Sequence, residues 1–388
     1  MKKQIIPLLL CMALLVGVIL PLALADVNLT SRFDEVGYYG VVTDGVGLKD
    51  TTSGDITIDV PGTVVAAYLY WAGIDYLPGG DDSVEFEGVA ITADESYGPE
   101  FWYDDKYHYV YFEDVTPLVS SGIDTYTVAD VELGYKNYGA GLVVVYEDMS
   151  LPWARIVLMD GLDGFYFGWG SPLGPNSETV CLQFAAETGG RDVSMFLLVG
   201  GTEHDDRPNE VWTETGTGTP LTNIITSPTA AGGSYPLVGG DGAAWDTYND
   251  SVEVPAGDEW LCAQVESIPE LGNPVPPYYG RGTSALLIAA GFVLPVERLD
   301  GLSPGFWKHN VRVALDYPGK YSVPHEGEPR MDYDTMTSLA ETATGLMGTD
   351  ALEAALAALT AKGPGSETIR LDMANAFNAA AGYAPYSD

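Results

Sequence analysis

The 388-residue sequence has few basic residues, few histidines and few cysteines, and each shortage excludes a class of function. It carries 17 lysines and arginines against 55 aspartates and glutamates, for a formal net charge of −38. A chain this acidic repels phosphate backbones and anionic lipid, which argues against a nucleic-acid partner. Cations are the natural partners, either through a solvated acidic surface or at discrete Ca²⁺ sites built from oxygen ligands.

Four histidines and three cysteines leave little for a zinc site. The sequence has no H-E-x-x-H, C-x-x-C, P-loop or dinucleotide-binding motif. Residues 301–305 read G-L-S-P-G, which matches the G-x-S-x-G nucleophile motif in its letters alone. That motif needs a parallel sheet before it and an acid and a histidine after it. The upstream pattern is antiparallel and too little chain follows, so we expect a protein that is not an enzyme.

Residues 1–25 have the organisation of a secretory signal peptide. Lys2 and Lys3 precede an apolar run, and Ala23-Leu24-Ala25 predicts cleavage after Ala25. No later run is long and apolar enough to hold the mature chain in a membrane, so we expect a secreted or cell-surface protein without membrane insertion. Export also permits a disulfide between Cys181 and Cys262, although two buried free thiols remain an equal alternative.

Residues 26–297 alternate apolar and polar side chains with the period of a β-strand. The runs are rich in Tyr, Val and Thr, and Gly, Pro, Asp and Asn separate them. This pattern predicts a mainly β fold, a β-sandwich or jelly roll, with a division near 165–180 left open. The predicted strands are 63–71, 83–87, 106–112, 125–128, 141–146, 155–158, 193–199 and 284–288. One short helix is expected at 115–121, with Asp114 as its cap.

Residues 298–388 change to helical spacing of Ala and Leu. The pattern predicts helices at 333–345, 349–361 and 367–381, and the segment 363–365, Gly-Pro-Gly, ends the second of them. The chain is therefore expected to end in a small α-rich module after the acidic β region.

Acidic loops are the candidate Ca²⁺ sites. None of them has the spacing of an EF-hand or of a nonapeptide repeat, and so many acidic residues also cluster by chance. The candidate ligands are Asp160, Asp163, Glu203, Asp205, Asp206, Asp241, Asp246 and Asp250. Sequons make Asn28 and Asn249 the candidates for glycosylation.

Aromatic residues in predicted loops and strand ends offer a second kind of site. Tyrosine and tryptophan rings can stack on sugars, which present an apolar face, or they can simply close the ends of a sandwich. The residues in question are Tyr76, Tyr97, Trp102, Tyr103, Tyr166, Trp169, Trp212 and Trp245.

Four phrases within residues 36–160 carry a family resemblance: VGYYGVVTDGVGL, VVAAYLYWAGID, DVTPLV-x3-G-x2-TYTVADV, and GAGLVVVYED followed by ARIVLMDG. In this order they resemble a domain of unknown function in secreted surface proteins of methanogenic archaea and some bacteria. The segment GLSPGFWKHN resembles a C-terminal extracellular module with a T-P-G-[FY]-W-K-N-H signature, although Ser303 replaces the Thr and His309-Asn310 is inverted. The resemblance implies a cell-surface protein of structural or adhesive type and supplies no catalytic residues.

Three functions are compatible with the sequence. The first is a non-enzymatic surface protein that self-assembles in an envelope layer or filament, with other surface proteins, glycans or further copies of itself as partners. The second is a polysaccharide-binding module assisted by Ca²⁺. The third is a secreted glycan hydrolase that uses two carboxylates, whose separation of about 5–9.5 Å no sequence can show.

Overall fold

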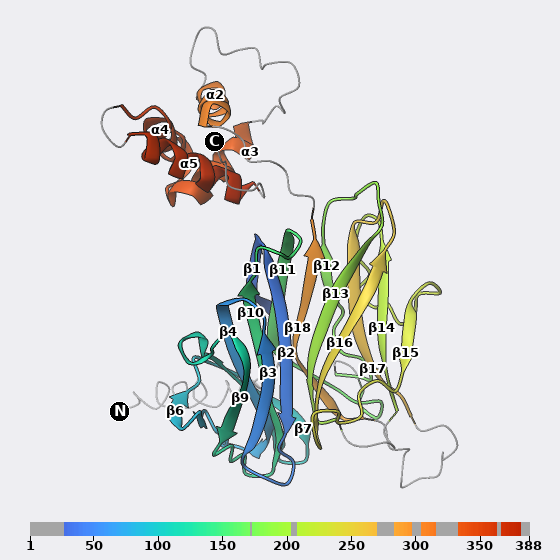
Figure 1. The fold of residues 1–388 in the computed structure, drawn as a ribbon. Coiled ribbons are helices and arrows are strands. Elements are labelled where there is room, and N and C mark those ends of the chain that lie inside the picture. Colours follow the sequence, from blue (N-terminus) through green and yellow to red (C-terminus); the bar gives the residue numbers. More distant parts are fainter. Residues whose placement is uncertain are drawn as a thin grey trace, which may run out of the picture. The chain divides into compact units, whose positions relative to one another are not determined.

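The computed structural model describes residues 27–170, 173–202, 208–269, 283–296, 304–315, 333–362 and 366–381. The chain forms two compact units (Figure 1). One unit contains most of residues 27–294 and is built from four sheets. The other contains the helices of residues 295–388 together with two short segments, Glu35–Tyr39 and Met149–Arg155. The mainly β fold and the helical C-terminal module predicted from the sequence are both confirmed. Residues 165–180 lie inside the first unit.

Two five-stranded sheets carry most of the core. Sheet A has the order β1 (Val27–Gly37), β11 (Ala154–Phe165), β18 (Ala285–Pro295), β13 (Arg191–Gly200) and β16 (Trp245–Val254). Sheet B has the order β2 (Tyr39–Gly47), β10 (Lys136–Glu147), β4 (Thr63–Tyr76), β8 (Lys106–Asp114) and β7 (Glu95–Tyr103).

Two four-stranded sheets complete the β-rich unit. Sheet C has the order β3 (Gly54–Val60), β9 (Gly122–Ala129), β5 (Ser83–Phe86) and β6 (Val89–Thr92). Sheet D has the order β12 (Val180–Gln183), β17 (Trp260–Ser267), β14 (Asn209–Gly216) and β15 (Ala231–Ser234). The strand pairs for which a register is defined are antiparallel, as the alternating sequence pattern predicts.

Sheets A and B face each other across a packed interior. Trp245 of β16 is fully buried and lies against β10, where a Cβ at Gly141 would come within 2.7 Å of its indole ring. Strands β4 and β10 are buried over almost their whole length, on both faces. Such strands read as continuous apolar runs because neither face meets water. The centre of sheet B is therefore enclosed on both faces.

The segment predicted as a helix at 115–121 is shorter than expected. It forms a 3₁₀ turn, η1 (Thr116–Leu118), and Val119 returns to an extended conformation. The prediction of Asp114 as the cap is wrong, because Val115 is the N-cap residue of this turn, although Asp114 Oδ1 accepts a hydrogen bond of 2.9 Å from the Thr116 amide. The Tyr126 hydroxyl accepts a hydrogen bond of 2.8 Å from the Ser120 amide. This bond fixes Ser120 within the segment that was expected to form another helical turn.

The C-terminal unit consists of α2 (Pro304–Ala314), α3 (Tyr333–Thr344), α4 (Gly348–Leu359) and α5 (Ser366–Ala380). The last three match the predicted helices to within two residues, whereas α2 was missed. Trp307 of α2 is fully buried, stacks on Phe377 with ring centres 4.9 Å apart, and donates a hydrogen bond to Asn378. The tryptophan of the GFWKHN segment is thus a core residue of this unit. No helix in the described ranges is long and apolar enough to cross a membrane.

Candidate functional site

The candidate site lies at the end of sheet B, around the hairpin that joins β7 to β8. Tyr103 and Lys106 pair across the hairpin, so the turn consists only of Asp104 and Asp105. Asp104 adopts a positive φ of 60°, which aspartate tolerates better than most residues in a two-residue turn. The tight turn projects two acidic side chains into solvent and places an aromatic and a basic side chain opposite each other.

Three tyrosine rings surround the Lys106 side chain at this end of the sheet, and Trp102 packs against two of them. Tyr76 ends β4, Trp102 and Tyr103 end β7, and Tyr135 immediately precedes β10. The Lys106 Nζ lies 5.0–6.0 Å from the centres of the three tyrosine rings. The rings also contact one another, with centres 5.7–6.1 Å apart. We call these five side chains the aromatic cluster.

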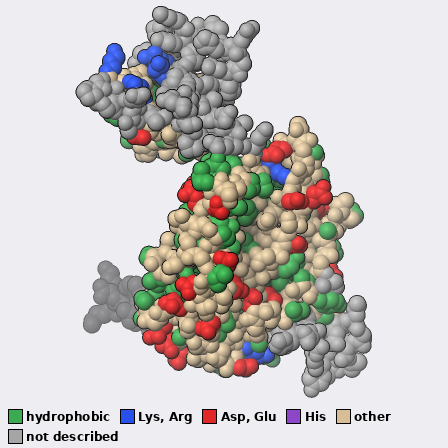
Figure 2. Space-filling model, in the orientation of Figure 1, with side chains coloured by type: hydrophobic (Ala, Val, Ile, Leu, Met, Phe, Trp, Pro, Cys, Tyr) green, Lys and Arg blue, Asp and Glu red, His purple; other side chains and the backbone are tan. Residues whose placement is uncertain are grey.

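The aromatic cluster is open to solvent. Tyr76, Tyr103 and Tyr135 are 40%, 66% and 45% exposed, which is unusual for large rings gathered at one place. Beside them, the Asp104 and Asp105 side chains are 74% and 70% exposed. On the face of the β-rich unit seen in Figure 2, acidic side chains are spread widely and basic ones are few.

This combination of groups suits a polyhydroxylated ligand with apolar faces. Exposed tyrosine rings offer flat surfaces for the C–H face of a sugar, and they are amphipathic because each carries a hydroxyl. The two carboxylates of the turn can accept hydrogen bonds from sugar hydroxyls, and the lysine can donate them. A cation held over aromatic rings also fixes their positions before a ligand arrives.

A buried histidine lies next to Trp102 of the aromatic cluster. His108, two residues along β8 from Lys106, is fully buried, and its ring centre lies 6.4 Å from that of Trp102. Its Nε2 is 3.0 Å from the Tyr138 hydroxyl, and its Nδ1 is 3.5 Å from Glu100 Oε1. Burial lowers the pKa of His108 to about 3, with a smaller contribution from the positive charge of Lys136. The ring is therefore neutral at pH 7, and its contact with Glu100 is not an ion pair there.

A second buried polar group lies further along the interface of sheets A and B. Asp160 of β11 is fully buried, and Arg32 of β1 donates to it through Nε at 2.8 Å. The hydroxyls of Tyr70 and Tyr97 donate to the same carboxylate at 2.8 and 3.2 Å. Arg32 donates hydrogen bonds to Glu95 and to Asp160, and these bonds raise the pKa of Arg32 against the opposing effect of burial. All this identifies Asp160 as the anion of a buried ion pair.

The candidate Ca²⁺ ligands do not converge in the part of the chain that the structure describes. No group of three metal-ligating side chains occurs there. Asp163 accepts the Glu178 amide at 2.6 Å, and Asp246 accepts the amides of Gly239 and Gly240 at 2.7 Å each. Asp241 and Asp250 likewise accept backbone amides, from Thr247 and Ser251 of β16. Glu203, Asp205 and Asp206 lie outside the described residues, as does the cleavage residue Ala25.

Cys181 and Cys262 form a disulfide. The sequence left two alternatives open, a disulfide or two free thiols, and the structure contains the disulfide. They are directly paired across β12 and β17 in sheet D. The bridge packs with Trp260, Ile224 and Trp212 in a small satellite core.

Both asparagines of the sequons are exposed. Asn28 lies on β1, and Asn249 lies on β16, an edge strand of sheet A. The Asn249 side chain accepts a hydrogen bond of 3.0 Å from Thr43 Oγ1.

Of the eight nominated aromatic residues, Tyr76, Trp102 and Tyr103 come together in the aromatic cluster. The other five serve elsewhere. Trp245 is in the core, Tyr97 binds Asp160, Trp212 donates to Glu266, and Tyr166 packs on Trp169. Sequence reasoning missed Lys106 and Tyr135. The two-residue Asp-Asp turn is a signal from which the pairing of Lys106 with Tyr103 could have been predicted. No local signal, in contrast, places Tyr135 beside Tyr76.

No protein-family model matches the chain, and no curated protein sequence matches it. Among solved structures, the N-terminal CBM22-1–CBM22-2 tandem domain of Paenibacillus barcinonensis Xyn10C is 8% identical, with 69% of this chain and 93% of that chain covered and a TM-score of 0.20. The infectious bursal disease virus Gx strain structure is 9% identical, with 71% and 75% covered and a TM-score of 0.23. The cycloalternan-forming enzyme of Listeria monocytogenes, in complex with a pentasaccharide substrate, is 11% identical, with 62% and 19% covered and a TM-score of 0.18. Similarity at this level carries no argument about the present chain.

Proposed function

We propose that this protein is a secreted surface protein that attaches to glycans through the aromatic cluster. The observation that carries the proposal is the gathering of three exposed tyrosines around Lys106, beside two exposed carboxylates, at the end of sheet B. Adhesion through such a surface needs binding energy and no catalytic centre, which agrees with the expectation of a non-enzymatic protein.

The composition supports the same proposal. A net charge of −38 disfavours anionic ligands such as nucleic acids and sulfated polymers. A neutral polysaccharide meets no such repulsion, because its binding relies on ring stacking and on hydrogen bonds to hydroxyl groups. Neutral glycans are therefore the ligand class that we propose for the aromatic cluster.

The test is binding of the full-length mature protein to an array of neutral polysaccharides, followed by calorimetry on the strongest ligand. Tyr103→Ala removes the most exposed ring, so we expect the fold to persist and the affinity to fall about tenfold, the equivalent of about 1.4 kcal/mol. Tyr235→Ala is the matched control, since Tyr235 is 44% exposed and lies outside the aromatic cluster. A blank array, or equal losses in the two variants, would end the proposal.

The same experiment tests the Ca²⁺-assisted alternative. Repeating the titration with EDTA removes divalent cations without altering the tyrosines. If binding needed an ion, EDTA would abolish it in the unaltered protein; if the aromatic cluster is sufficient, the affinity stays the same.

A further inference from the structure

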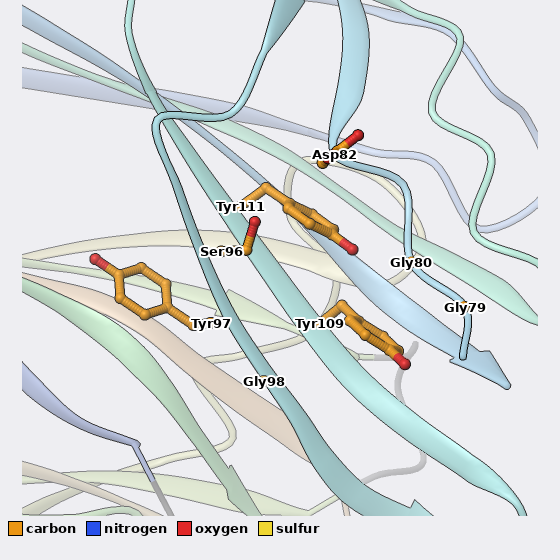
Figure 3. Close-up of a pocket in the computed structure, with 8 residues that line it drawn as sticks. All are labelled: Gly79, Gly80, Asp82, Ser96, Tyr97, Gly98, Tyr109 and Tyr111. Carbon is orange, nitrogen blue, oxygen red and sulfur yellow. The ribbon is translucent and has the colours of Figure 1, made fainter. Parts of the chain in front are cut away.

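A cavity of about 290 Å³ lies on the opposite face of strand β8 from His108 (Figure 3). Tyr109 and Tyr111 alternate along the strand with His108 and Val110, so their rings project together to this face. The two ring planes are within 3° of parallel, and their centres are 6.4 Å apart. The segment Gly79–Gly80 passes beside their hydroxyl ends, while Ser96 and Gly98 approach from β7.

The backbone is shaped to leave this cavity open. Gly80 has a φ of +118°, and a Cβ there would lie 2.3 Å from the Tyr111 hydroxyl. Any other residue would both be strained and push into the tyrosine pair. Asp75 holds the segment in place by accepting the Gly80 amide at 2.8 Å.

The two tyrosine hydroxyls of the cavity differ in their hydrogen bonding. The Tyr111 hydroxyl already accepts a hydrogen bond of 2.8 Å from the Asp81 amide. Tyr109 is only 6% exposed, and its hydroxyl has no hydrogen-bond partner among the described residues. Leaving a buried hydroxyl unpaired costs free energy, so a ligand that pairs with it gains affinity.

The charge around the cavity selects the sign of that ligand. None of the eight lining residues is basic, and Asp82 is among them. Besides burial, the charge of Asp75 raises the pKa of Tyr109, and the charges of Asp81 and Asp82 raise that of Tyr111. Both phenols therefore stay protonated and sit in a negative potential, which attracts cations and repels carboxylates and phosphates.

We propose that this cavity binds a cationic amino sugar, a hexosamine with a free ammonium group. An ammonium group can donate to the Asp82 carboxylate, which lines the cavity, and a sugar hydroxyl group can pair with the Tyr109 hydroxyl. The cavity is about ten times the ~30 Å³ that one water occupies, which suits a pyranose ring better than a slender alkyl chain. The tyrosine rings supply the apolar lining for its C–H groups. This inference does not depend on the aromatic cluster.

The test is calorimetric titration of the mature protein with glucosamine at a pH that keeps the amine protonated. N-acetylglucosamine is the neutral control for charge, and Nα-acetyl-lysine amide presents the same ammonium group on an alkyl chain. We expect glucosamine to bind, N-acetylglucosamine to bind at least about tenfold more weakly, and the lysine amide to bind more weakly than glucosamine. Equal binding of the two sugars, tighter binding of the lysine amide, or no binding of glucosamine would each overturn the proposal.

Two variants locate the site. Asp82→Asn removes the charge at constant shape, and Tyr109→Phe removes only the hydroxyl; each is expected to weaken glucosamine binding roughly tenfold. Asp59→Asn neutralises an exposed carboxylate of sheet C and should leave the affinity unchanged. Tyr103→Ala should also leave it unchanged, which separates this cavity from the aromatic cluster. Undiminished binding in both Asp82→Asn and Tyr109→Phe would place the sugar elsewhere and refute the assignment.

Discussion

The disulfide between Cys181 and Cys262 should contribute a large share of the stability of the β-rich unit. The cysteines are 81 residues apart in sequence, so the bridge closes a long loop in the unfolded chain. The chain-entropy relation for a loop of that length predicts a contribution of about 4.5 kcal/mol at 25 °C. Whole domains are stable by only about 5–15 kcal/mol, so a loss of this size is easily measured.

The perturbation is the double variant Cys181→Ser, Cys262→Ser, which removes the bridge and both thiols of the pair. Urea unfolding followed by far-ultraviolet circular dichroism reports on the strands, which dominate the secondary structure of the chain. The unaltered protein measured after reduction with dithiothreitol is the internal control, because it loses the same cross-link without a change of sequence. We expect the urea concentration at the midpoint of unfolding to fall by a similar amount in both samples. If the free energy of unfolding fell by less than about 1 kcal/mol in both samples, the reasoning would be refuted. Such a result would mean that the bridge does not stabilise the protein by restricting the loop in the unfolded chain.

Two buried polar groups lead to further predictions. The pKa of His108 is about 3 in the folded protein and 6.5 in an unfolded chain, so below pH 6.5 the unfolded state binds the proton more tightly. Stability should therefore fall by up to about 1.4 kcal/mol per pH unit from pH 6.5 toward 3, and His108→Gln should remove this slope in urea midpoints measured from pH 8 to 4. An unchanged slope in the variant would show that another group is responsible. Arg32→Met leaves the Asp160 carboxylate buried without its cation and should cost about 3–5 kcal/mol in urea unfolding at pH 7, with partial recovery in Arg32→Lys; a neutral result would mean that water reaches Asp160.

Periodicity determined the class of fold from local information. Runs such as 83–87 and 125–128 alternate because one face of each strand is buried and the other is not, and adjacent residues of the sequence carry that alternation. The helices α3, α4 and α5 were equally readable, because their Ala and Leu residues recur at helical spacing. Helix α2 is not evident from the sequence, because it begins with Pro304 and Gly305, which are also typical of loops.

The long strands at the centre of sheet B show where local pattern is weaker. Strand β4 extends to Tyr76, beyond the predicted end at Trp71, because it is covered on both faces and its neighbours continue to pair with it. Strand ends depend on these pairings, which involve residues far away in the sequence. The aromatic cluster depends on the extra length, since it is the end of β4 that brings Tyr76 beside Tyr135.

The sequence alone determined that this chain is acidic, mainly β, and followed by a helical module, since charge and periodicity are properties of neighbouring residues. It also nominated rings and cysteines that the fold uses. Only the tertiary structure decided which of them meet: it paired the two cysteines of β12 and β17, placed Asp160 against Arg32, and brought Tyr76 and Tyr103 together at Lys106. The physical reason is that a site joins side chains from several strands, and which strands are neighbours is settled by the packing of the whole unit.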